Sequence, residues 1–524
     1  MNQPPSRRAV LGMLGAAPVA AAGLLSTSNT AHAGPANPAD PVHADPALAT
    51  RIREIIDGSE FAGARWGMRF QPHGADTPLH TLNPDDQFVP ASAVKVLIAG
   101  SAFAALGADH RFRTRVHRTG PVRHGVLDGD LVLVAGGDLV LGPRLRPHGQ
   151  VAVPYPDHTY GSATDLIHGD PLQQLRALAG QVRCRGIRRV EGRIVVDASL
   201  FREGREDIAN GNDPIPVSPM MLNDNVVDVV VTPGPAAGTP AELRISPRTS
   251  YVSVQGDVTT IPAGQAPRPL TFTRTATNPD GSHTVRLTGD VVAGGQPVVR
   301  PYYVPDPARF TEVAFAQALD DAGIGVVGAP TTPAARHLVA EHVSPALAEL
   351  SKVMLKLSSN VHTVYFPYLV GAVAGHDPVT AKATGVGLQR ALFAQAGLDP
   401  AESDDGAYSP NFFVQFLDHL VRQPYFDAYY RALPILGRDG TLADVTPDSP
   451  AAGHVYAKTG TGGTGTKLYK AMAGYLFLPD GRPVVFAEFL DRNVGSLAEA
   501  MALQARAGEL QAEIVTAVHE SLTR

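Results

Sequence analysis

The residues in this sequence whose types and spacing could do chemistry begin with a serine and a lysine. Ser92 and Lys95 lie three positions apart in a run that is otherwise apolar. On a helix this spacing places both side chains on one face, about a turn apart. Burial favours the neutral form of a lysine, and a neutral amine beside a serine hydroxyl is a general base beside a nucleophile. A solvated lysine at a helix rim would give the same pattern, so the pair needs partners.

Two partner motifs follow in order along the chain. Ser358-Ser359-Asn360 comes after an apolar helical segment, and Lys458-Thr459-Gly460-Thr461 comes at the end of a predicted strand. Alone, the two motifs would be interpreted as a polar loop and a turn. The ordered set Ser-x-x-Lys, Ser-x-Asn and Lys-Thr-Gly resembles the three-part signature of the penicillin-recognising serine acyl-transferases.

Acyl transfer explains why these residue types are needed. The reaction requires a nucleophile, a base, a proton donor to the leaving amine, an oxyanion hole and a group that holds the substrate carboxylate. The resemblance implies that Ser92 attacks and that Lys95 takes its proton. In the second motif, Ser358 would pass a proton to the leaving amine, and Asn360 would hold the substrate and the lysine. In the third motif, Lys458 would supply positive potential, Thr459 and Thr461 would bind the carboxylate, and Gly460 would let the strand approach the substrate closely. The backbone N–H groups of Ser92 and Thr461 would form the oxyanion hole.

Over nearly the whole mature chain, the sequence is similar to the D-alanyl-D-alanine carboxypeptidase/endopeptidases, the low-molecular-mass class C penicillin-binding proteins. The matching stretches include Val89-Pro90-Ala91-Ser92, Gly129-Asp130-Leu131, Gly136-Gly137-Asp138, Gly440-Thr441-Leu442 and Ala473-Gly474-Tyr475. The resemblance implies an α/β (α+β) fold: a transpeptidase/β-lactamase-like antiparallel sheet flanked by helices, with two inserted β-rich domains. The 266 residues between Ser92 and Ser358 argue against a one-domain β-lactamase.

The elements that would position these residues are predicted in this order along the chain: a helix, a long β-rich middle, several helices, a hairpin and a last helix. The apolar run 91–106, between Pro90 and Gly107, predicts a buried helix. Short Val/Leu/Ile runs punctuated by Gly and Pro fill 112–305 and predict strands. Helical patterns return at 307–322, 346–353 and 379–396, strands at 471–478 and 483–490 flank a turn, and 497–521 predicts a last helix. The predicted organisation is 1–33 signal peptide, 34–48 linker, 49–115 first part of the transpeptidase-like domain, 116–305 inserted β-rich domains, and 306–524 second part.

The N-terminus predicts export. Arg7-Arg8 precedes an Ala-rich apolar run, and Ala31-His32-Ala33 resembles a cleavage site. The arginine pair resembles a twin-arginine signal. The run is shorter than the ~20 residues that a spanning helix needs, so we expect cleavage rather than a retained membrane anchor. The mature protein would then work outside the cytoplasm, in the cell wall or periplasm, with no stable membrane span.

Three departures from the family pattern lie near the predicted cleft. His362-Thr363-Val364 stands where relatives have a small residue and then Glu, and 405–410 reads Asp-Gly-Ala-Tyr-Ser-Pro instead of Asp-Gly-Ser-Gly-Leu-Ser. The loop after Thr461 looks about four residues longer than in relatives. None of these changes the nucleophile, but each could change which acyl donor or acceptor fits.

Composition and spacing weigh against other classes of function. The net charge of −6 gives no basic surplus for nucleic acid, and the single cysteine, Cys184, excludes an internal disulfide and a cysteine-based zinc cluster. The eighteen histidines show no metal-binding spacing, so we expect no metal and no cofactor. Residues 460–465 satisfy G-x-G-x-x-G, but a hairpin rather than a helix is predicted to follow, which argues against a dinucleotide site. His362 is the one histidine that the sequence places beside the cleft, although an ordinary core or surface histidine is the favoured interpretation for it as well.

We therefore expect a secreted serine D,D-peptidase that acts on peptidoglycan stem peptides through a Ser92 acyl-enzyme and is inhibited by β-lactams. Carboxypeptidase and endopeptidase action use the same residues and stay unranked. Two alternatives stay open: a catalytically weak protein that binds the cell wall, and an esterase or acyl-transferase of the same fold with a specialised substrate.

Overall fold

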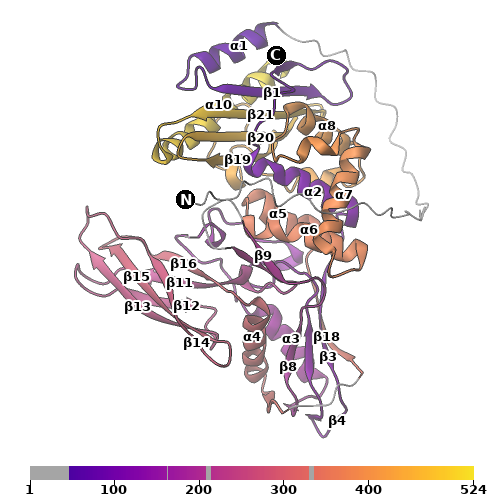
Figure 1. Cartoon of the computed structure of the whole chain (residues 1–524), viewed down its shortest axis with the longest axis vertical. Coiled ribbons are helices and arrows are strands. Elements are labelled where there is room, and N and C mark those ends of the chain that lie inside the picture. The colour runs from indigo at the N-terminus through magenta and orange to yellow at the C-terminus, as the bar shows by residue number, and fades with distance from the viewer. Residues whose placement is uncertain (1–45, 162, 208–213, 330–334, 524) are drawn as a thin grey trace, which may run out of the picture. The chain divides into compact units, whose positions relative to one another are not determined.

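The computed structural model describes residues 46–161, 163–207, 214–329 and 335–523 (Figure 1). The helices are α1 (Pro46–Asp57), α2 (Lys95–Leu106), α3 (Gln173–Cys184), α4 (Pro307–Asp321), α5 (Leu347–Lys356), α6 (Asn360–Gly375), α7 (Ala381–Gln395), α8 (Pro410–Val421), α9 (Phe426–Tyr430) and α10 (Leu497–Thr523). The strands are β1 (Arg65–Pro72), β2 (His80–Leu82), β3 (Arg113–Arg118), β4 (Val122–Arg123), β5 (Val126–Leu127), β6 (Leu131–Val134), β7 (Arg189–Val190), β8 (Ile194–Asp197), β9 (Gly204–Glu206), β10 (Ile215–Val217), β11 (Val226–Thr232), β12 (Glu242–Ser246), β13 (Val252–Ile261), β14 (Thr271–Thr277), β15 (His283–Val292), β16 (Val298–Tyr303), β17 (Gly325–Val326), β18 (His337–Val343), β19 (Val455–Gly463), β20 (Lys467–Phe477) and β21 (Pro483–Asn493).

One five-stranded antiparallel sheet joins the two ends of the described chain. Its strand order is β19-β20-β21-β1-β2, and β1 pairs with β21 over its whole length. Side chains alternate between the two faces: Phe486 and Leu490 pack with α1 and α10, whereas Val485 and Phe489 pack with the helices on the other face. The predicted α/β (α+β) architecture, an antiparallel sheet flanked by helices, is confirmed (Figure 1).

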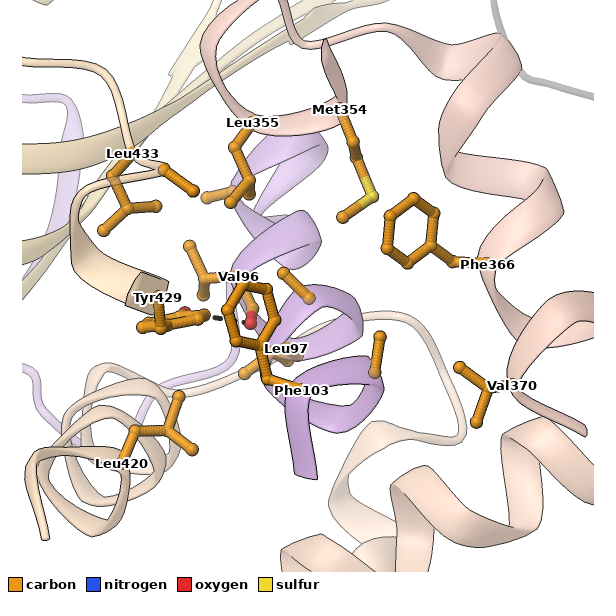
Figure 2. Close-up of a cluster of buried hydrophobic side chains, with 14 of the residues drawn as sticks. Val96, Leu97, Phe103, Met354, Leu355, Phe366, Val370, Leu420, Tyr429 and Leu433 are labelled. Atoms are coloured by element: carbon orange, nitrogen blue, oxygen red, sulfur yellow. Dashed lines mark hydrogen bonds between the residues drawn. The ribbon is translucent and has the colours of Figure 1, made fainter. Parts of the chain in front are cut away.

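Helix α2 is buried among the other helices of its layer. Its side chains Val96, Leu97 and Phe103 contact residues of α5, α6, α8 and α9, and Figure 2 shows this cluster. The Tyr429 hydroxyl also donates a hydrogen bond to the Val96 carbonyl oxygen at 3.0 Å. The predicted helix over 91–106 is confirmed, except that its first turn, Ala91–Val94, is a 3-10 turn. Ser92 lies in this turn, and Lys95 is the first residue of α2.

The middle of the chain contains far more strand than helix, as the sequence predicts. It contains a four-stranded sheet of order β18-β3-β6-β8 and two three-stranded sheets, β12-β11-β16 and β13-β15-β14. It also contains α3, which the turn-rich sequence did not indicate; Leu175, Leu178 and Val182 bury one face of that helix. Helix α4 packs against α3 and β8. The domain borders inferred from the sequence stay a prediction.

The predicted signal peptide, residues 1–33, lies outside the described residues, and so do residues 34–45 of the predicted linker. Residues 46–48 of that linker belong to α1. Within the described residues, no helix is both long enough and apolar enough to cross a membrane.

A buried ionic network joins the middle of the chain to the start of α6. Arg144 donates hydrogen bonds to Asp157 at 2.6 Å and to Asp224 at 2.5 Å, and His158 lies between Asp224 at 2.6 Å and Asp228 at 2.9 Å. All five side chains are buried. Burial alone would lower the pKa of His158, but the carboxylates of Asp228 and Asp224 raise it to about 10. The network therefore holds an arginine and an imidazolium against three carboxylates at neutral pH.

His362 extends the network into α6. Its Nε2 atom lies 3.4 Å from an Asp224 oxygen, and its Nδ1 atom lies 2.8 Å from the hydroxyl of Ser359. Ser359 caps the N-terminus of α6, because its hydroxyl accepts a hydrogen bond from the His362 backbone N–H. The segment that carries Ser358 and Asn360 is thus tied to the middle of the chain by polar contacts as well as by packing.

Replacing Arg144 with leucine should lower the free energy of unfolding by about 3–5 kcal/mol, because the change leaves Asp157 and Asp224 buried without their cation. Arg189→Leu is the matched control, since Arg189 pairs with Glu191 on the surface, where an ion pair contributes about 1 kcal/mol or less. Urea unfolding of the two variants measures the difference. Equal, small losses in both would contradict the role given to Arg144.

Candidate active site

The Lys95 amine is the centre of the site. Its Nζ atom lies 3.0 Å from Ser92 Oγ, 2.6 Å from the Ser358 carbonyl oxygen, 3.1 Å from Ser358 Oγ and 2.7 Å from Asn360 Oδ1. The structure therefore brings together four residues that the sequence predicts for the site, from two motifs 266 residues apart.

The surroundings of this amine favour its neutral form. Lys95 is 2% exposed, and its burial lowers the pKa of the amine to about 7. The described residues place no carboxylate within ion-pair distance of it. A neutral amine can donate its two N–H groups to the Ser358 carbonyl oxygen and to Asn360 Oδ1, and its lone pair can accept the Ser92 hydroxyl proton.

Local backbone geometry places the second motif. Ser358 has a φ angle of 59°, in the left-handed region that non-glycine residues seldom adopt. Its carbonyl oxygen and its hydroxyl both accept hydrogen bonds from Lys95. Asn360 then begins α6, so its amide is fixed to a helix end that Ser359 caps. The turn at Ser358 is thus held by the same lysine that it helps to orient.

Strand β19 passes directly against the turn that carries Ser92. A Cβ atom at Gly460 would lie 2.1 Å from the Pro90 carbonyl oxygen and 2.9 Å from the Ala93 nitrogen, so no side chain fits there. The sequence predicted that Gly460 allows close approach of the strand to substrate; the space that it leaves is taken by the backbone of the Ser92 turn. Thr459 and Thr461 flank this contact on the same strand.

Lys458, which the sequence predicts as a source of positive potential in the cleft, does not line the cavity at Ser92. Its side chain is fully buried, and its Nζ atom donates a hydrogen bond to the Thr459 carbonyl oxygen at 2.6 Å. Burial, together with the nearby Lys95 and Lys470 amines, holds the pKa of Lys458 well below its usual range. The charged form of Lys458 is therefore disfavoured, and its amine lies outside the cavity lining.

A cavity of about 530 Å³ opens at Ser92. Its lining includes five of the predicted residues, Ser92, Ser358, Asn360, Thr459 and Thr461. It also includes residues that sequence reasoning missed: Tyr155 and Tyr160 from the middle of the chain, Thr441 and Lys470. The two tyrosine rings meet edge to face at 5.6 Å, and the Thr441 hydroxyl lies 2.7 Å from that of Thr459. Thr441 belongs to a stretch that matches relatives, which could have indicated it; no sequence signal marked the tyrosines.

The structure also places His362 and the G-x-G-x-x-G stretch, two further features of the sequence. His362 is fully buried in the ionic network and does not line the cavity, so the position beside the cleft expected for it is wrong. The G-x-G-x-x-G stretch lies in the antiparallel hairpin β19–β20, and no helix follows it as a dinucleotide site requires. The described residues contain no group of three or more His, Cys, Asp or Glu side chains that could hold a metal ion.

Comparison with known proteins agrees with this geometry. The chain is 28% identical over 483 residues to the D-alanyl-D-alanine carboxypeptidase of Actinomadura sp. strain R39, covering 84% of this chain and 82% of that protein. It is 22% identical over 422 residues to the D-alanyl-D-alanine carboxypeptidase DacB of Haemophilus influenzae, covering 76% of this chain and 80% of that protein. The crystal structure of penicillin binding protein 4 (dacB) from Haemophilus influenzae has the same fold, with a TM-score of 0.66, 20% identity and coverage of 90% of this chain and 99% of that one.

The chain also matches the model of a whole protein family. Residues 48–511, which include all three motifs, match the family model described as D-Ala-D-Ala carboxypeptidase 3 (S13). A serine and a buried lysine on one helix, completed by a Ser-x-Asn turn and a Lys-Thr-Gly strand, thus place this chain in the D-Ala-D-Ala carboxypeptidase 3 (S13) family of serine hydrolases.

Proposed function

We propose that the protein is a serine D,D-peptidase that cleaves the D-Ala–D-Ala end, or D-amino-acid cross-links, of peptidoglycan stem peptides through an acyl-enzyme on Ser92. The observation that carries the proposal is the Lys95 amine, which is buried without a carboxylate partner and lies 3.0 Å from the Ser92 hydroxyl. A buried base beside a serine has a direct use in acyl transfer.

Acylation can be written with the residues that surround this amine. Ser92 Oγ attacks the carbonyl carbon of the penultimate D-alanine, and its proton moves to Lys95 Nζ. The C–N bond then breaks, and the departing nitrogen takes a proton from the Ser358 hydroxyl. Lys95, 3.1 Å from Ser358 Oγ, returns its extra proton to that oxygen. The products are an ester on Ser92, a free terminal D-alanine and a neutral lysine, ready for the next step.

Deacylation repeats the sequence with water in place of serine. Water attacks the ester carbonyl, Lys95 accepts its proton, and Ser92 leaves with that proton, which restores the free enzyme. The choice between carboxypeptidase and endopeptidase action depends on what occupies the leaving-group side of the cavity, a single D-alanine or the side-chain amine of a second peptide. The exposed Tyr155 and Tyr160 rings line the same cavity, and we propose that they contact the larger group.

β-Lactams should acylate the same serine. In a β-lactam the C–N bond broken by Ser92 lies in a ring, so the leaving nitrogen stays attached and hinders the entry of water. A solved structure of the Haemophilus influenzae penicillin binding protein 4 is described as complexed with a novel β-lactam, and it shares 19% identity with this chain. For this chain we further propose export, by the twin-arginine route, because its substrate would lie outside the cytoplasm and Arg7-Arg8 precedes an apolar run.

Intact mass spectrometry after incubation with benzylpenicillin tests the nucleophile. Residues 34–524 should gain one penicilloyl group, and Ser92→Ala should gain none. The matched control is Ser101→Ala, which removes a buried hydroxyl from α2 that bonds to the Leu97 carbonyl oxygen and not to Lys95. An adduct on Ser92→Ala would contradict the assignment, and a folded wild type without adduct would favour the wall-binding or specialised-substrate alternative.

The rate of acylation by the methyl ester of benzylpenicillin, which carries no carboxylate, should rise with pH and level off, with an apparent pKa near 7. Below that pH Lys95 is an ammonium with no lone pair, and above it the neutral amine accepts the Ser92 proton. The rate should therefore increase roughly tenfold between pH 6 and pH 8. Stopped-flow measurements give the profile, since the ester itself does not titrate in this range. A rate that stays constant over these two units would contradict Lys95 as the base.

A further inference from the structure

A third buried lysine borders the cavity, and the mechanism above does not use it. Lys470 lies on β20, 8% exposed, and its Nζ atom donates a hydrogen bond to Thr461 Oγ1 at 2.9 Å. The described part of the chain offers it no carboxylate within ion-pair distance. A buried ammonium with one protein acceptor keeps two N–H donors without a protein partner, which is costly unless an anion approaches them.

Among the described residues that line the cavity with Ser92, Lys470 is the only charged one. Lys95 is surrounded by four oxygen atoms, and Lys458 donates to the Thr459 carbonyl beneath the cleft. Burial lowers the pKa of Lys470 only to about 8, so this amine keeps its charge at neutral pH. The cavity therefore has one cation that can meet a charged group of the substrate.

A glycine in α10 leaves this ammonium accessible. A Cβ atom at Gly508 would lie 3.3 Å from Lys470 Nζ and 3.2 Å from its Cε, and Gly508 itself lines the cavity. Glycine inside a helix costs about 1 kcal/mol relative to alanine. The missing side chain keeps open the space in which an anion can reach Lys470.

We propose that Lys470 binds the free C-terminal carboxylate of the acyl donor and so makes the enzyme selective for peptides and β-lactams that carry that carboxylate. The inference rests on the proposed Ser92 acyl-enzyme. In a D-Ala–D-Ala peptide the terminal carboxylate is three bonds from the carbonyl carbon that Ser92 attacks, so its cation must lie beside Ser92. Thr461 meets this condition, because β19 contacts the Ser92 turn at Gly460, and Lys470 is bonded to Thr461.

The hydrogen bonding at Thr461 is consistent with two donors to one carboxylate. Thr461 Oγ1 accepts from the Lys470 ammonium, so its own O–H is free to donate to the carboxylate that the ammonium also binds. Lys458, which the sequence suggested as the source of positive potential here, has its Nζ atom directed to a backbone carbonyl instead. Selectivity for the carboxylate is thus assigned to Lys470.

The test compares benzylpenicillin with its methyl ester, which has the same β-lactam ring and no carboxylate. Lys470→Met should slow acylation by benzylpenicillin about 10- to 100-fold, the range of a lost hydrogen bond between charged groups, and change acylation by the ester less than about threefold. Lys470→Arg should keep most of the wild-type preference. Lys467→Met, which removes the same charge from an exposed position on the same strand, should behave as wild type.

The outcomes separate this inference from the proposed function. If Lys470→Met loses rate equally with both compounds, or with neither, Lys470 does not bind the carboxylate. If the wild type is acylated by neither compound, the Ser92 acyl-enzyme fails and this inference fails with it. Should Lys470→Met not fold, Lys470→Gln carries the same comparison, since glutamine keeps a polar end and a similar length without the charge.

Discussion

The burial of lysine amines without carboxylate partners is the constraint on which the rest of the site depends. An ammonium moved out of water is costly unless it is paired, and a lysine in such a place shifts towards its neutral form. Lys95 is surrounded by the oxygen atoms of Ser92, Ser358 and Asn360, none of which carries a charge. Those contacts satisfy the amine without fixing its proton, which is what a base that must take and return a proton needs.

Holding that arrangement requires segments distant in sequence to meet. The Ser92 turn continues into α2, whose apolar side chains are packed among α5, α6, α8 and α9. The second motif lies at the capped start of α6, which the His362–Asp224 contact ties to the middle of the chain. The third motif lies on β19, brought against the Ser92 turn by the absence of a side chain at Gly460. Core packing thus fixes the first motif, the buried ionic network fixes the second, and the close backbone contact at Gly460 fixes the third.

The sequence predicted the parts of this site that local pattern can encode. Residue type and spacing indicated Ser92, Lys95, Ser358, Asn360 and the β19 motif, and hydrophobic periodicity predicted α2, the β20–β21 hairpin and α10. Sequence pattern could not predict contacts between residues that are distant along the chain. Nothing near Tyr155, Tyr160 or Arg144 in the sequence says that they face the cleft or the network. Arg144 bonds to Asp224, 80 residues away along the chain, and Tyr160 bonds to the Leu357 carbonyl oxygen, 197 residues away. His362 was expected beside the cleft for the same reason: its burial is decided by Asp224.

Lys470 is marked in the sequence by the rarity of lysine in this chain. The chain contains seven lysines, at positions 95, 352, 356, 382, 458, 467 and 470, among 44 lysines and arginines. A chain that relies so largely on arginine for positive charge has a lysine beside the apolar run 471–478, which is as unusual as Lys95 in its helix. The side chain's use becomes apparent only when β20 is paired with β19 and Thr461 comes within 2.9 Å.

The most direct test of the central claim is a titration of the Lys95 amine itself. With so few lysines, the protein labelled with ¹³C-lysine should give a resolved NMR spectrum, and Lys95→Arg identifies the Lys95 signal by its loss. The Cε resonance of Lys95 should reach its midpoint near pH 7, well below the ordinary range for lysine. A Lys95 resonance that remains in its protonated position up to pH 9 would contradict the account.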